Sequence, residues 1–129
     1  MFSFFKKKEK NNRDLFRARL KLVLDEIYDS DDHVQITIGK AIYMADAIFK
    51  QTFPTPDDFV NLPHNAKLEY LNQFSTARMN IEEKTGSKLY ALGFEIYEMW
   101  LGIVSVKDKA LFYEFVDDIT FFCDIGEEQ

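Results

Sequence analysis

Hydrophobic residues recur at steps of three and four along most of this chain, the spacing that places them on one face of an α-helix. The pattern is densest over residues 89–104, where Leu92 and Ile96 share a broad apolar face. Only a narrow strip carrying Glu95 and Glu98 is left for water. We therefore expect this stretch to be the central helix of a bundle.

The same period predicts four further helices. They span residues 13–28, 33–52, 63–84 and 107–123. Gly86 is expected to end one helix in a left-handed conformation, and Ser87 to cap the next. Asp29 or Ser30 is expected to cap the second helix. The alternation of residues 34–38 also fits a short strand, but the longer helical pattern outweighs it. The predicted fold is an all-α, single-domain helical bundle of four to five helices.

Length and composition agree with one folded domain. The chain has 129 residues, of which 47% are hydrophobic and 16% aromatic, which is too rich for an intrinsically disordered protein. We expect residues 1–12 to form a flexible basic and aromatic N-terminal segment, residues 13–125 to form the helical bundle domain, and residues 126–129 to form a solvated acidic tail.

Cysteine usage and the apolar stretches indicate a cellular location. The single cysteine, Cys123, cannot form an intramolecular disulfide, which is typical of the reducing cytosol. The apolar start at residues 1–5 is too short for the core of a secretory signal. A helix over residues 89–104 would span only about 24 Å, short of the ~30 Å hydrocarbon core of a membrane. We therefore expect a cytoplasmic protein.

Side chains that could support catalysis or bind a metal are few and poorly grouped. A di-iron bundle needs Glu-x-x-His pairs, and neither histidine has a glutamate three positions earlier. Asp29 and His33 offer two ligands at helical spacing, too few for a metal site. Glu95 and Glu98 form a candidate acid–base pair, but two glutamates on a polar strip are usually solvated. We predict a protein that is not an enzyme, with no catalytic residue, no metal ligand and no cofactor.

The formal net charge of −6 is unevenly distributed. Residues 1–21 hold eight lysines and arginines against two acids, a net of +6, which leaves −12 for the other 108 residues. Nucleic-acid binding needs a basic surface, and the acidic body would repel phosphates. We expect no nucleic acid among the partners.

The acids of the body gather at two corners, which we interpret as a partner-binding surface. Its residues are Asp25, Glu26, Asp29, Asp31 and Asp32 at the end of the first predicted helix, and Glu114, Asp117 and Asp118 on the last. Such surfaces speed association with oppositely charged partners. The leading hypothesis is a non-catalytic protein-binding module, of the inhibitor, immunity or adaptor kind, that engages a basic protein. The competing interpretation is that the acid only keeps a small protein soluble.

The N-terminal segment suggests an alternative function. Aromatic and basic residues that could contact a membrane or another anionic surface are Phe2, Phe4, Phe5, Lys6, Lys7 and Lys8. Rings of this kind insert between headgroups while lysines meet anionic lipids, which would make the protein a peripheral membrane-associated bundle. An ordinary charged N-terminus explains the same residues without any function. Homo-oligomer formation, and a small helical enzyme or ligand carrier, also stay open at this point.

Overall fold

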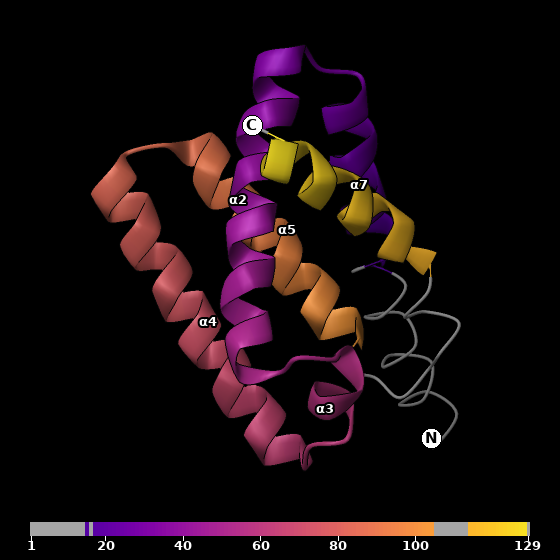
Figure 1. Cartoon of the computed structure of the whole chain (residues 1–129), viewed down its shortest axis with the longest axis vertical. Coiled ribbons are helices and arrows are strands. Elements are labelled where there is room, and N and C mark those ends of the chain that lie inside the picture. The colour runs from indigo at the N-terminus through magenta and orange to yellow at the C-terminus, as the bar shows by residue number, and fades with distance from the viewer. Residues whose placement is uncertain (1–14, 16, 105–113, 129) are drawn as a thin grey trace, which may run out of the picture.

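The computed structural model describes residue 15, residues 17–104 and residues 114–128 (Figure 1). Every regular element in this part of the chain is an α-helix, which confirms the predicted all-α class. The stretch 34–38, whose alternation also fitted a strand, is helical. Residues 17–28 form the first helix, and the helices that follow are α2 (Asp32–Thr52), α3 (Pro56–Val60), α4 (His64–Thr85), α5 (Lys88–Val104) and α7 (Val116–Glu128).

Local side-chain chemistry sets several of the helix ends. Gly86 ends α4 with φ at 63°, the left-handed conformation that glycine adopts without strain. The Ser87 hydroxyl then accepts a hydrogen bond from the Tyr90 amide at 3.1 Å, which caps α5. Both ends are as predicted. The N-cap of α2 is Asp31, whose side chain accepts from the Val34 amide, rather than Asp29 or Ser30.

Helix α2 lies at the centre of the bundle (Figure 1). Among helices α2, α3, α4, α5 and α7, its contacts with α7 and with α5 are the two most extensive, and α4 also packs against α5. The sequence pointed to α5 as the central helix. That helix is deeply buried, with Phe94, Ile96 and Leu101 at 0% exposure. However, α2 is the element that connects the α5 layer to α7.

Small residues allow α2 to approach both neighbours closely. A Cβ atom added to Gly93 of α5 would stand 2.4 Å from the Cβ of Ala41 on α2. A Cβ added to Gly126 of α7 would stand 2.2 Å from the carbonyl oxygen of Gly39, also on α2. Backbones packed this closely leave no room for a larger side chain. Two glycine contacts therefore fix the position of α2.

The chain's C-terminal residues differ from the expected acidic tail at 126–129. Helix α7 continues to Glu128, and Gly126 is buried. The reason is the four-residue step from Phe122 to Gly126, which keeps Gly126 on the buried face of α7. Residues 105–113, where the last helix was expected to begin, lie outside the described part of the chain.

The polar strip of α5 is less open to water than expected. Ala91, which belongs to the strip, is 6% exposed. Glu98 forms an ion pair with Arg78 of α4 at 2.8 Å, and each side chain is only 23% exposed. The strip is thus partly covered by α4. Within the described residues, no helix combines the length and the apolar character that crossing a membrane requires.

Candidate functional site

The first helix lies against α7, which brings the two acidic corners together. The Tyr28 hydroxyl donates a hydrogen bond to Asp118 Oδ1 at 2.8 Å. The Tyr28 ring also packs on Phe121 and Phe122, with ring centroids 5.4 and 5.1 Å away. Residues that are 90 positions apart in the sequence therefore join the end of the first helix to α7.

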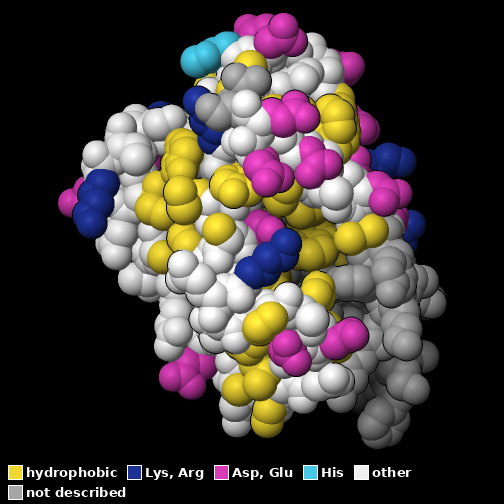
Figure 2. All heavy atoms as spheres, in the orientation of Figure 1, with side chains coloured by type: hydrophobic (Ala, Val, Ile, Leu, Met, Phe, Trp, Pro, Cys, Tyr) yellow, Lys and Arg dark blue, Asp and Glu magenta, His cyan; other side chains and the backbone are white. Residues whose placement is uncertain are grey.

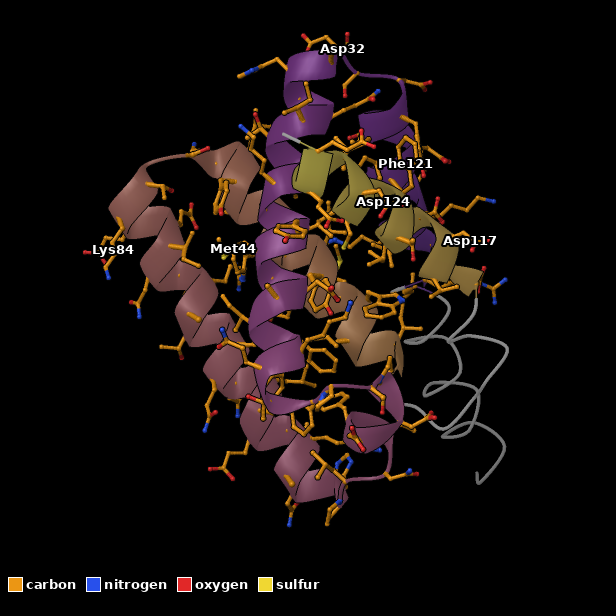
Figure 3. All side chains as sticks on the ribbon, viewed as in Figure 1. Asp32, Met44, Lys84, Asp117, Phe121 and Asp124 are labelled. Carbon is orange, nitrogen blue, oxygen red and sulfur yellow. The ribbon has the colours of Figure 1, made fainter. Side chains whose placement is uncertain are left out.

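An exposed aromatic pair lies within this junction. Tyr28 is 39% and Phe121 is 43% exposed, although both are large and largely apolar. Exposed carboxylates occupy neighbouring positions on the same two helices. We call the group the acidic–aromatic face, and its residues are Tyr28, Phe121, Asp25, Glu26, Asp29, Asp117 and Asp124. Figure 3 shows Asp117, Phe121 and Asp124 along α7, and Figure 2 shows acidic side chains gathered over the upper part of the same view.

The electrostatic potential of this face is negative at Tyr28. Burial raises the pKa of the Tyr28 phenol well above its ordinary value, and the hydrogen bond and charge of Asp118 and the charge of Asp25 raise it further. The phenol therefore keeps its proton at all physiological pH values. Tyr28 therefore remains a hydrogen-bond donor to Asp118.

Three of the predicted partner-binding acids have structural roles. Asp31 caps α2, Asp118 holds Tyr28, and Glu114 forms an ion pair with Arg17 at 2.9 Å. The other five make no ion pair within the described part of the chain, and all of them are exposed. These are Asp25, Glu26, Asp29, Asp32 and Asp117. They are the acids of the original prediction that remain available to a partner.

A groove runs between α2 and α7 next to this face, with a volume of about 510 Å³. Its lining includes Asp46 and Lys50 of α2, Trp100 of α5, and Cys123, Asp124 and Glu127 of α7. Asp46 accepts a hydrogen bond from the Tyr97 hydroxyl at 2.7 Å and forms an ion pair with Lys50 at 2.8 Å. The groove therefore has both apolar and acidic lining, and the hydrogen bond and ion pair of Asp46 hold one of its walls in place.

A second, smaller cleft of about 280 Å³ contains the glutamate pair of α5. Glu95 and Glu98 both line it, together with Arg19 of the first helix and Arg78 of α4. No pattern in the sequence indicates that these glutamates lie in a cleft. Glu98 is already engaged by Arg78 in an ion pair at 2.8 Å.

Cys123 lies in the larger groove as a protonated thiol. Burial, together with the charge of Asp46, raises its pKa to about 12, while Lys50 acts in the opposite direction. We expect iodoacetamide to modify native Cys123 more than about a hundredfold more slowly at pH 8 than it modifies a free cysteine, since little thiolate is present. The rate should still rise about tenfold per pH unit between pH 8 and 10, where a free thiol already levels off.

The matched control for this reaction is the same chain unfolded in guanidinium chloride. Cys123 is the only cysteine, so mass spectrometry reads the rate at that residue alone. Equal rates in the native and unfolded chain at pH 8 would show that the groove does not raise the pKa of the thiol.

Within the described ranges, no three histidine, cysteine or carboxylate side chains come together in an arrangement that could bind a metal ion. Asp29 and His33, the pair considered from the sequence, are both exposed and lie on either side of the Asp31 cap.

The residues proposed for membrane contact fall outside the described part of the chain. They are Phe2, Phe4, Phe5, Lys6, Lys7 and Lys8. Comparison with family models, with curated proteins and with solved structures finds no match for this chain. Functional inference therefore rests on the chain's own residues.

Two residues of the acidic–aromatic face were missed by sequence reasoning. Tyr28 was counted only as the end of a helix, although it is embedded in an acidic run. Phe121 lies four residues after Asp117 and three before Asp124, a helical stripe that could have marked it as an outer-face aromatic. This spacing is the feature of the sequence that identifies Phe121 as part of the face.

Proposed function

We propose that this protein binds a basic protein partner through the acidic–aromatic face, and that it acts by binding rather than by catalysis. The observation that supports the proposal is the junction of the first helix and α7, where Tyr28 and Phe121 stay exposed among carboxylates from both helices. Acid that served solubility alone would have no need of an exposed aromatic pair at its centre.

The layout resembles the anatomy of protein interfaces in general. Aromatic side chains supply much of the binding energy at the centre of an interface, and polar side chains form the rim. Here Tyr28 and Phe121 take the central position, and Asp25, Asp29 and Asp117 take the rim. A partner with lysines or arginines around an apolar patch would match both parts.

Rim charges and central aromatics are expected to act on different rate constants. Replacing Asp25, Asp29 and Asp117 by lysine should slow association at least about tenfold at low salt, and the loss should shrink as salt rises. Phe121→Ala should instead speed dissociation about tenfold or more. These three acids are preferable to Asp31, Glu114 and Asp118 because they have no structural role in the described chain.

The measurement begins with capture from the native cell, using the wild-type chain and each variant side by side. A protein held by the wild type is then purified, and its binding kinetics are measured by surface plasmon resonance. The matched control replaces three exposed acids of α4 by lysine, namely Glu69, Glu82 and Glu83. If this control weakens binding as much as the rim variant, total charge and not the acidic–aromatic face governs association.

A further inference from the structure

The groove between α2 and α7 has the dimensions and the walls of a small-ligand site. Its volume of about 510 Å³ falls within the range that such sites occupy. Trp100, Val116 and Ile119 supply apolar lining. In the space-filling view, hydrophobic side chains line a hollow near the middle of the face, beside a basic side chain (Figure 2).

The charged side chains of the groove carry an excess of negative charge. Lys50 lies 2.8 Å from Asp46, so these two charges compensate each other. Asp124 and Glu127, three positions apart on α7, add two further carboxylates to the lining. A ligand in the groove therefore meets two negative charges that are not balanced by a basic residue of the lining.

The titrating groups of the groove respond to this negative field. At Cys123, after the effect of burial, the charges of Asp46, Asp124 and Glu127 each raise the pKa of the thiol. At Lys50, the hydrogen bond that its ammonium group donates to Asp46 raises the pKa most, and the charge of Glu127 also raises it. Two side chains on opposite walls thus experience a potential that stabilises positive charge.

We propose that the α2/α7 groove binds an organic cation, an ammonium or guanidinium group carried on an apolar stem. The stem lies against Trp100 and Ile119, and the cationic group lies between Asp124 and Glu127. An indole also attracts cations to its face, which adds to the selectivity for positive charge. The chemistry is the same for a free amine and for a lysine or arginine side chain of another protein.

The groove contains its own reporter of binding. Trp100 is the only tryptophan of the chain, so a change in tryptophan emission reports on the groove alone. Probes are 2-phenylethylamine as the cation, 2-phenylethanol as a neutral analogue of similar shape, and 3-phenylpropanoate as an anion. We expect the amine to shift Trp100 emission at concentrations at least about tenfold lower than the alcohol, and the anion to have no effect. The amine should also slow alkylation of Cys123.

Isosteric variants test the assignment of the two carboxylates without altering the shape of the groove. Asp124→Asn with Glu127→Gln should weaken amine binding about tenfold and leave alcohol binding unchanged. The matched control is Glu69→Gln with Glu128→Gln, which removes two charges from exposed positions of α4 and α7 that do not line the groove. Circular dichroism and thermal unfolding verify that both variants keep the fold.

Two further probes separate the sources of the cation. Tighter binding of blocked arginine, N-acetylarginine amide, than of 2-phenylethylamine assigns the groove to a protein side chain, and the reverse order assigns it to a free amine. The proposal is overturned if the alcohol binds as well as the amine, if no cation shifts Trp100 emission, or if the control variant loses as much affinity as the groove variant. The variants that test the acidic–aromatic face replace Asp25, Asp29, Asp117 and Phe121, none of which lines the groove, so either proposal can fail alone.

Discussion

Replacing Gly93 by alanine is expected to lower the free energy of unfolding by about 3 kcal/mol, the upper part of the usual range for overpacking a helix interface. The added Cβ would stand 2.4 Å from the Cβ of Ala41 and 3.0 Å from the carbonyl oxygen of Ile38. The second contact is with backbone, so a side-chain rotation cannot relieve it. α2 and α5 would have to separate along an extensive interface.

Urea unfolding followed by circular dichroism measures this loss, and two further variants identify its cause. Gly102→Ala is the matched control, because a Cβ at Gly102 of the same helix meets nothing within 4 Å. It should be neutral or stabilising by up to about 1 kcal/mol, the difference in helix propensity. Ala41→Gly combined with Gly93→Ala should restore part of the loss, since it removes the nearer of the two clashing groups. If Gly93→Ala and Gly102→Ala behave alike, the close approach of α2 and α5 is wrong.

The positions of the helices could be predicted from the sequence because they depend on local information. Hydrophobic period, the glycine at residue 86 and the serine at residue 87 each act within a few residues, and the structure places helix ends close to the expected points. Inward faces followed as well. Ile96, for instance, was expected on the apolar face of the helix at residues 89–104, and it is buried.

The central role of α2 could not be predicted in the same way. Its contacts with α5 and α7 depend on Gly39 and Ala41, and on Gly93 and Gly126 of the partner helices. Such residues contribute little to a hydrophobic pattern, yet they decide how closely two helices approach. The hydrophobic pattern therefore favours α5, the most apolar segment, as the central helix, although α2 makes the closest contacts. For the same reason Gly126 was assigned to a solvated tail.

The acids of the candidate site could be predicted from the sequence, but the contacts that bring the two helices together could not. The sequence identified the acids at both corners, and five of the eight are exposed and without an ion pair in the described structure. The hydrogen bond from Tyr28 to Asp118 spans 90 positions, and no periodic pattern encodes that pairing. The lining of the groove includes Trp100 of α5, and no local pattern encodes its position beside α2 and α7.

Phe49→Ala is expected to lower the free energy of unfolding by about 3–5 kcal/mol, the usual cost of truncating a buried phenylalanine. Phe49 is 1% exposed. Its ring lies within 5.4–6.1 Å, centroid to centroid, of four other aromatic rings, which are those of Phe53, Phe59, Tyr70 and Tyr97. These rings come from α3, α4, α5 and the residue that follows α2. Removing Phe49 therefore leaves a cavity where most of the bundle's helices meet, and edge-to-face ring contacts are lost with it.

The matched comparison is Phe121→Ala, the same chemical change at a ring that is 43% exposed. Its loss in urea unfolding should be under about 1 kcal/mol, because the exposed part of the ring gains little from folding.

The two variants also separate stability from binding. Phe49→Ala should unfold more easily, while its folded fraction keeps its affinity for a partner. Phe121→Ala should keep its stability and lose affinity for the partner. Equal losses of stability would mean that Phe121 supports the junction of the first helix with α7. Its exposure could then not be taken as a sign of a partner.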